Sequence, residues 1–235
     1  FIHVHNRLYL ALYDAEQAEI MARHELKLNF LVVPLPKNDT SCDVGEDNEF
    51  FKPSSLTEIF KFDEMACTLE RKNPTMKLVF CTGVHRPSQV RIAFLVGCHM
   101  IMSHGIGFEE THLSFKHFHG LFDRVAPAAD GNAVSVSNCW RALCRAKCLN
   151  WIDFRKVVAG EREDVPCICM DEYMHYASTL NGDIHLVVPG EFLLFDAPSG
   201  SVGSAPWVDE GGRRRFGAAF YADLFEYLGV VLVVR

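Results

Sequence analysis

Short apolar runs alternate with longer helical patterns through the first 150 residues of the chain. Three of these runs, at 8–13, 29–35 and 76–81, have the length and composition of strands. Ser55, followed three residues later by Glu58, forms a capping box that satisfies free amides at a helix start. The pattern therefore predicts a helix from that point, with an apolar stripe formed by Leu56, Ile59, Phe60, Ala66, Cys67 and Leu69.

Three further helices are expected in the same part of the chain. Residues 90–102 are apolar nearly all round, which is typical of a helix buried on most sides. Residues 108–118 and 137–149 carry helical patterns, and the loop 126–131 separates them. The polar stretch 36–48 predicts another loop.

The pattern changes after residue 150. Residues 150–181 have few periodic runs and a charged stretch at 161–164, and they are interpreted as a linker. The remaining segments predict two short strands, at 184–188 and 192–195, that are joined by Pro189–Gly190. A Gly/Ser-rich loop at 197–217, an amphipathic helix at 218–228 and an apolar strand at 230–234 are expected to follow.

The expected fold class is α/β, in two parts. A compact domain is expected over 1–150, a linker over 151–183, and the start of a second, truncated domain over 184–235. Two strands, a helix and another strand leave a parallel sheet unfinished, because its crossover partners would lie beyond Arg235.

Composition excludes two classes of partner. The formal net charge is −7, and the one cluster of basic residues is the triplet Arg213–Arg215, so nucleic acid is not expected as a partner. The longest apolar run, 92–102, is shorter than the roughly 18 residues that a membrane span needs, so no membrane partner is expected either.

The nine cysteines and eleven histidines do not form a recognisable metal motif. The cysteines lack disulfide-framework spacing, which favours a reducing compartment. The pairs Cys144/Cys148 and Cys167/Cys169 lack zinc-site spacing, and His112, His117 and His119 do not form an i, i+4 pair. No metal or other cofactor is expected; the alternative, a metal or redox protein, predicts stoichiometric zinc or iron.

The turn after the third strand is the one segment with the layout of a catalytic loop. It places Cys81 at a strand end and leads into a helix N-terminus, which together favour anion binding. Cysteine-dependent phosphatases need an Arg six residues after the Cys and a Ser or Thr after that. Ser88 is in place, but Pro87 occupies the clamp position, Arg86 is one residue early, and Val84 replaces a glycine. A degenerate phosphate loop without catalytic activity is therefore predicted.

Several stretches, spread over almost the whole chain, resemble the cell-division-cycle 14 type of dual-specificity protein phosphatase. The most specific is Asp171-Glu-Tyr-Met-His-Tyr176, continued by Asn181-Gly-Asp183 and by Val187-Val-Pro-Gly-Glu-Phe192, which is similar to the family's DEYEHY…NGD…(I/V)(I/V)P…F segment. The others are Phe51-Lys-Pro-Ser-Ser-Leu56, Ile92-Ala-Phe-Leu-Val-Gly97, Asn138-Cys-Trp-Arg-Ala-Leu143 and Trp151-Ile-Asp-Phe154.

The resemblance implies a dual-specificity-phosphatase-like domain, with a mostly parallel sheet flanked by helices, that is itself non-catalytic. It implies a linker helix and then a catalytic domain of the same type in cis, with the catalytic Cys/Arg loop and general-acid Asp beyond Arg235. The family hydrolyses phosphoserine before proline and prefers a downstream basic residue. Phosphoprotein substrates of cyclin-dependent kinases are therefore the implied partners, in the nucleus or cytoplasm. A binding module without turnover, a pseudophosphatase, is the alternative.

The family's linker carries carboxylates that attract the basic residue of the substrate. Met174 and Ala177 occupy two of those places in this chain, and Asp183 alone keeps its acid. These three residues are the expected substrate groove, and basic-residue selection is expected to be weakened. The other interpretation of Asp183 is a turn residue after Asn181–Gly182. The loops 36–48, 160–166 and 200–215 depart from the family pattern and have no assigned role.

Overall fold

The structure of the chain is a computed structural model. It describes residues 1–13, 17, 20–21, 29–34, 51, 53–83, 85–122, 134–154, 168–203, 205–211 and 213–234. The predicted loops at 36–48, 126–131 and 160–166 and the loop residue Val84 lie outside these ranges. The chain divides into two compact units: unit 1 comprises Phe1–Leu149 and Asp153–Val157, and unit 2 comprises Asn150–Ile152 and Val158–Arg235.

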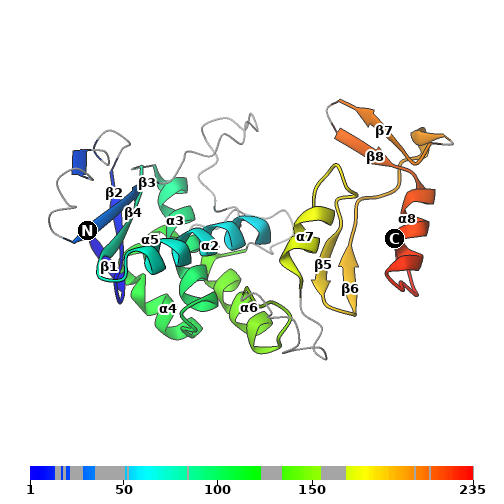
Figure 1. Ribbon diagram of the computed structural model, residues 1–235. Helices are drawn as coiled ribbons and strands as arrows, with labels where there is room; N and C mark the ends of the chain where they lie inside the picture. The colour runs from blue at the N-terminus through cyan, green and yellow to red at the C-terminus, as the bar shows by residue number, and fades with distance from the viewer. Residues whose placement is uncertain are drawn as a thin grey trace. The chain divides into compact units, whose positions relative to one another are not determined.

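The described residues of unit 1 form a four-stranded mixed sheet (Figure 1). Its strands are β1 (Ile2–His5), β2 (Leu8–Leu12), β3 (Phe30–Pro34) and β4 (Lys77–Thr82), in the order β1-β2-β4-β3. β4 runs parallel to both of its neighbours, and β1 is antiparallel to β2. The predicted strands 8–13, 29–35 and 76–81 are confirmed to within a residue or two. β1 escaped prediction because His3 and His5 interrupt its apolar pattern.

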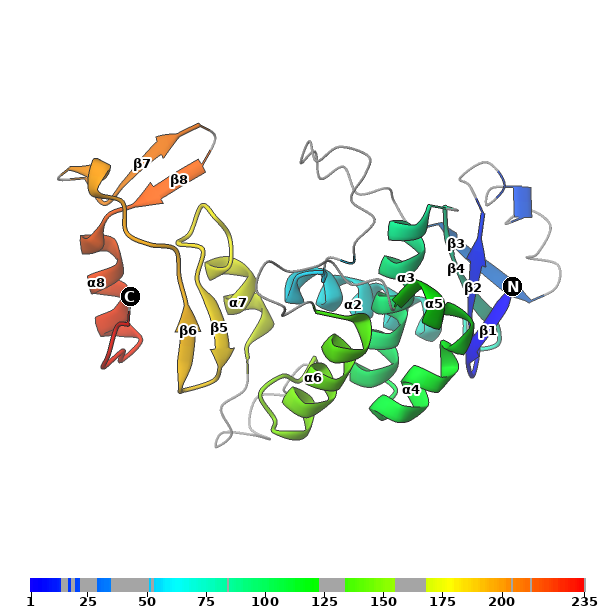
Figure 2. The same cartoon turned by 180° about the vertical axis from the view of Figure 1, so that it is seen from behind.

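The helices α2–α6 lie on the same side of this sheet in both views (Figure 1 and Figure 2). Helix α2 (Leu56–Lys72) begins as predicted, with the Ser55 hydroxyl accepting a hydrogen bond from the Glu58 amide at 3.2 Å. Helix α3 (Arg86–Met102) starts four residues earlier than the apolar run. Every residue of α3 from 90 to 102 except Arg91 is buried, which confirms the expected central helix.

The single helix expected at 108–118 is wrong in its extent. Helix α4 (Phe108–Ser114) is followed by a 3-10 turn, η2 (Lys116–Phe118), and by α5 (His119–Phe122). The break places the buried rings of Phe115 and Phe122 against Trp140 of α6 (Val136–Cys148), and the buried Phe118 against both phenylalanines. An aromatic cluster therefore overrides the helical pattern, since a 3-10 turn brings side chains three residues apart into line.

The described residues of unit 2 form two antiparallel hairpins and two helices (Figure 1). In chain order its elements are α7 (Met170–Tyr176), β5 (His185–Val188), β6 (Phe192–Leu194), the 3-10 turn η3 (Gly200–Val202), β7 (Trp207–Glu210), β8 (Arg213–Phe216) and α8 (Ala218–Tyr227). Its core packs Ile184 against three aromatic residues, Phe216, Tyr221 and Phe225. The predicted strands at 184–188 and 192–195 and the predicted helix at 218–228 are confirmed, and the two strands pair as an antiparallel hairpin.

α7 lies within 151–183, where the resemblance implies a linker helix. Three other expectations for this part of the chain are wrong. β7 and β8 form a hairpin inside the predicted loop 197–217. The run 230–234 is not a strand: no described strand pairs with it, and Val231 is 99% exposed. The strands described in unit 2 form antiparallel hairpins, so the expected parallel arrangement is absent among them.

Within the part of the chain that the structure describes, no helix combines the length and apolar character needed to cross a membrane.

Candidate functional site

The candidate phosphate loop joins β4 to α3, but its cysteine lies inside the strand. Cys81 is paired in register with Ala11 of β2 and Pro34 of β3, and β4 continues for one more residue. Phe80 packs on Phe62 of α2, with ring centroids 5.1 Å apart. Because side chains alternate across a strand, Cys81 points to the opposite face of the sheet. There it packs with Ala11, Val32 and Val79.

The thiol of Cys81 is in an apolar environment. The residue is 2% exposed, and burial raises the pKa of its thiol to about 11. The thiolate is the nucleophilic form, so this sulfur is poorly reactive near neutral pH. Arg86 begins α3 and Ser88 follows in its first turn, both partly buried, with Pro87 at the start of the helix. The first turn of a helix tolerates proline because the amide there has no helical partner.

The predicted substrate-groove residues lie close together in sequence, on α7 and the turn that follows it. Met174 is a partly buried residue of α7, and Ala177 caps the C-terminus of that helix. The Asp183 amide donates to the Ser178 carbonyl at 3.1 Å, and Asp183 has a φ of 52°. Aspartate tolerates this left-handed conformation better than most residues. The turn role of Asp183 is thus compatible with the geometry, and its carboxylate remains 40% exposed.

Asp183 has a partner that the sequence did not reveal. His185 Nε2 lies 3.1 Å from Asp183 Oδ1, and His185 Nδ1 lies 3.1 Å from the Tyr173 hydroxyl. The three side chains form a continuous polar chain from α7 through the start of β5 to the turn. The neighbouring position of His185 could be read from the sequence, but Tyr173 is brought in by the packing of α7 on β5.

A pocket of about 670 Å³ lies in unit 2. Its walls come from α7, the β5–β6 hairpin, the end of α8 and residues 228–234. Tyr176, Leu186 and Phe225 give it an apolar lining, and Glu172 and Glu191 add negative charge at its edge. Tyr173 belongs both to this pocket and to the polar chain around Asp183.

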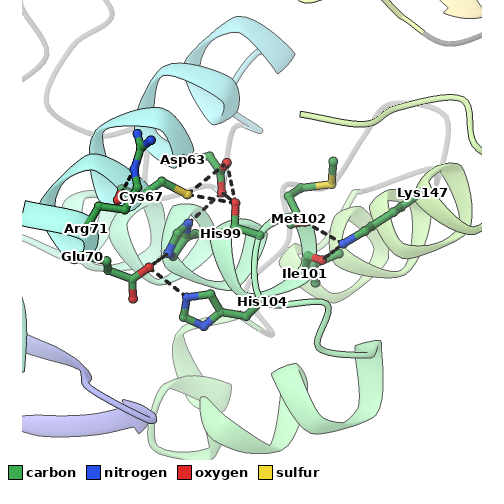
Figure 3. Close-up of polar contacts among 10 residues, drawn as sticks. Asp63, Cys67, Glu70, Arg71, His99, Ile101, Met102, His104 and Lys147 are labelled. Carbon is green, nitrogen blue, oxygen red and sulfur yellow. Dashed lines mark hydrogen bonds and ion pairs between the residues drawn. The ribbon is translucent and has the colours of Figure 1, made fainter. Parts of the chain in front are cut away.

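A buried polar network in unit 1 was missed altogether by sequence reasoning (Figure 3). Asp63 of α2 is 3% exposed, and its Oδ1 lies 2.7 Å from Nδ1 of the fully buried His99 of α3. The Ser103 hydroxyl is 2.8 Å from both carboxylate oxygens of Asp63, and the Cys67 thiol donates to the Ser103 oxygen at 3.1 Å. Asp63 therefore has polar partners on both of its oxygens.

The network continues to Glu70 and His104. Glu70 Oε2 lies 3.1 Å from His104 Nε2 and 3.5 Å from His99 Nε2. Burial acts to raise the pKa of Glu70, but the hydrogen bonds from His104 and His99 hold it below its ordinary value. Burial acts to lower the pKa of His99, but its contacts with Asp63, Cys67 and Glu70 raise it well above the usual range. The arrangement stabilises a positive charge between two carboxylates.

Comparison with known proteins identifies relatives of the chain, although no family model matches it. It is 23% identical over 205 residues to the dual specificity protein phosphatase CDC14C of Symphalangus syndactylus, which is 84% of this chain and 38% of that protein. It is 23% identical over 193 residues to CDC14B of Mus musculus (79% and 36%) and 28% identical over 153 residues to CDC14A of Homo sapiens (63% and 24%). The chain thus spans less than half the length of each of these relatives. The resemblance predicted from the sequence is confirmed: over most of its length, this chain is similar to the CDC14-type dual specificity protein phosphatases.

Proposed function

We propose that the chain is part of a dual-specificity protein phosphatase that acts on phosphoserine-proline sites of phosphoproteins, among them substrates of cyclin-dependent kinases. The observation that carries the proposal is the similarity to CDC14-type phosphatases over as much as 84% of the chain. Residues 1–150 are the non-catalytic phosphatase-like domain, 151–183 the linker, and 184–235 the start of the catalytic domain. The whole enzyme releases phosphate from phosphoserine, phosphothreonine and phosphotyrosine.

The environment of Cys81 supports a non-catalytic role for the first domain. A thiol whose pKa is raised to about 11 carries little negative charge at neutral pH, and it faces an apolar cluster within the sheet. The clamp position carries Pro87, which has neither a cation nor a backbone amide donor to offer a phosphate. Arg86 and Ser88 then serve as the first turn of α3.

The surface around α7 and Asp183 is the proposed contribution to substrate selection. Asp183 offers an exposed carboxylate to a basic residue of the substrate, and Met174 and Ala177 offer no charge. His185 already contacts the Asp183 carboxylate at 3.1 Å, so it competes with the substrate for this acid. An exposed ion pair contributes roughly 0.2–1 kcal/mol, which corresponds to at most about a fivefold effect on affinity.

Turnover and binding can be measured separately. The 235-residue chain is expected not to hydrolyse a chromogenic aryl phosphate, whereas the product of the complete gene releases phosphate from a phosphoserine-proline peptide. Hydrolysis by the 235-residue chain that disappears in Cys81→Ser would contradict the non-catalytic assignment. Peptide binding by the complete gene product without phosphate release would instead support the alternative, a pseudophosphatase module.

Substrate selection is tested by fluorescence anisotropy with two phosphoserine-proline peptides, one with a downstream lysine and one with glutamate in its place. Asp183→Asn is expected to weaken binding of the lysine peptide by roughly two- to fivefold. His185→Ala is expected to strengthen it, because the carboxylate loses its competitor. Asp223→Asn makes the same change at an exposed acid of α8 and should leave both affinities unchanged. Equal affinity of the unaltered chain for both peptides would refute the role of Asp183.

A further inference from the structure

Three side chains with metal-binding groups meet at one point of unit 1, the Glu70–His99–His104 cluster (Figure 3). Glu70 lies on α2, His99 on the last turn of α3, and His104 just after α3. Glu70 Oε2 is 3.1 Å from His104 Nε2 and 3.5 Å from His99 Nε2. One donor atom from each residue lies within 4.8 Å of the other two. Segments far apart in the sequence therefore present one oxygen and two nitrogens to a common point.

A hydrogen bond to Asp63 fixes the orientation of the His99 ring. Its Nδ1 lies 2.7 Å from Asp63 Oδ1, and Asp63 is in turn held by the Ser103 hydroxyl. The other ring nitrogen, Nε2, is buried and faces the Glu70 carboxylate, whose Oε2 lies 3.5 Å away. A carboxylate behind a histidine is the usual arrangement at protein metal sites, where it orients the ring and makes the ligating nitrogen more basic. Asp63 would act here as a positioning residue.

The two Glu70 distances and the donor types fit a zinc-class ion. A four-coordinate zinc ion with bonds of about 2.0–2.1 Å places its ligand atoms about 3.3 Å apart. The two Glu70 contacts, at 3.1 and 3.5 Å, lie on either side of that value. Two histidines and one glutamate form a known three-ligand zinc set, which leaves a fourth position for water. Glu70 and His104 are each 16% exposed, so water and an ion can reach the cluster from that side.

The negative charge of Asp63 and Glu70 also requires a compensating positive charge nearby. Asp63 and Glu70 place two carboxylates around one fully buried imidazole, and buried carboxylates are costly without a compensating positive charge. His5, which is half-buried and has its ring centroid 5.8 Å from that of His104, lies near the same side. The compensating charge is therefore either a proton on His99 or a bound metal ion.

We propose that the Glu70–His99–His104 cluster binds one divalent ion of the zinc class, with Asp63 holding His99 in place. A second donor group, Asp63, Cys67 and His99, is the weaker candidate. Its Asp63 oxygens are already engaged by His99 and Ser103, and its Cys67 thiol donates to Ser103. The proposed site is independent of the phosphatase function, because neither the Cys81 loop nor the Asp183 surface contributes a ligand to it.

Cobalt titration tests the proposal on the whole chain. The chain is freed of metal with a chelator and titrated with Co²⁺, which takes the same sites as zinc and absorbs visible light strongly when four-coordinate. Saturation at one equivalent, reversed by one equivalent of Zn²⁺, is the expected result. Absence of binding at one equivalent would overturn the proposal and leave His99 as the buried cation of an ion-pair network.

Matched variants locate the ion. His104→Gln and Glu70→Gln are each expected to weaken Co²⁺ binding at least about tenfold, and Asp63→Asn about 10- to 100-fold. His117→Gln, at an exposed histidine outside the cluster, should bind as the unaltered chain does. Far-UV circular dichroism checks that each variant is folded, and His104→Gln changes the more peripheral of the two histidines. Full binding in His104→Gln, or a thiolate-to-cobalt charge-transfer band, would place the ion elsewhere and refute the site.

Discussion

Gly97→Ala should destabilise unit 1 strongly, although alanine is the better helix former. Gly97 lies in the middle of α3, where the indole ring of Trp140 from α6 packs directly on it. A Cβ added to Gly97 would come within 2.6 Å of Trp140 Nε1 and closer still to two ring carbons. Normal contacts between such atoms are about 3.5–4.0 Å, so the indole must move.

Trp140 has little freedom to move. It is completely buried, and its Nε1 donates a hydrogen bond to the Phe94 carbonyl at 3.0 Å. Overpacking of a core costs about 1–3 kcal/mol, and a buried N–H that loses its acceptor costs about 1–3 kcal/mol more. Against these costs, replacement of glycine by alanine within a helix stabilises the folded state by about 1 kcal/mol. The expected net loss of unfolding free energy is about 1–5 kcal/mol.

Urea unfolding followed by tryptophan fluorescence measures this loss. With a urea m-value of about 2 kcal/mol/M, the unfolding midpoint should fall by about 0.5–2.5 M. Gly120→Ala is the matched control, because Gly120 is an exposed helical glycine whose added Cβ would meet nothing within 4 Å. That control should be neutral or slightly stabilising.

A double-mutant cycle separates the clash from other effects. Trp140→Phe removes the larger ring system, so Gly97→Ala should cost less in that background than alone. An unchanged or raised midpoint for Gly97→Ala in the original chain would refute the close packing of α3 on α6. Equal costs in both backgrounds would refute Trp140 as the group that is struck.

Three further outcomes are expected from other parts of unit 1. Cys81 in the folded chain should resist iodoacetamide at pH 8, because its thiolate fraction grows only as the pH approaches about 11. The exposed Cys148 should react with iodoacetamide under the same conditions. Peptide mass spectrometry measures the labelling of both cysteines, and rapid labelling of Cys81 would contradict its burial. Ser55→Ala should lower the unfolding free energy by about 1 kcal/mol through loss of the α2 cap, with Ser54→Ala as an unaffected control in the same urea assay. Lys147→Met should lower the unfolding free energy by about 1–3 kcal/mol, because the Lys147 ammonium group donates hydrogen bonds of 2.6 Å to the Ile101 and Met102 carbonyls. Lys116→Met, at an exposed position, is the control. Equal losses in the two variants would show that these hydrogen bonds contribute nothing.

The elements that sequence reasoning located share a strong apolar period. α3 was predictable because nearly every residue from 90 to 102 is apolar, and the strands β5 and β6 because Pro189–Gly190 separates two apolar runs. The β7–β8 hairpin lacks such a pattern. Its cross-strand contacts include Asp209 with Arg214 and Glu210 with Arg215, and charges carry no hydrophobic period. Gly211, at a φ of 60°, marks its turn but resembles a loop glycine in the sequence.

The strand expected at 230–234 shows the opposite failure. Its residues are uniformly apolar, yet a strand also needs a neighbour to accept its ladder hydrogen bonds. The described strands provide none, and the Val230 amide instead donates back to Phe225 of α8 at 2.8 Å. Apolar composition alone could not distinguish these two conformations.

Sequence spacing rules could not predict the proposed metal-binding cluster, for another reason. His99 and His104 are five residues apart, outside the helical ligand pair that a motif search recognises, and Glu70 lies on a different helix. Only the packing of α2 on α3 brings the three together. The degenerate Cys81 loop, by contrast, could be assessed from sequence, because Pro87 at the clamp position is visible without a structure.

The central place of β4 sets the order in which unit 1 can be assembled during synthesis. Leu8 of β2 pairs with Leu78, and Phe30 of β3 pairs with Lys77. Both earlier strands therefore lack this pairing partner until β4 has been synthesised. A ribosome adds about 5–20 residues per second, and β2 and β3 therefore spend seconds outside the exit tunnel with unpaired edges. Such edges invite pairing with other chains. Expression yield at high synthesis rates, and its response to chaperones that hold extended segments, should accordingly depend on this one late strand.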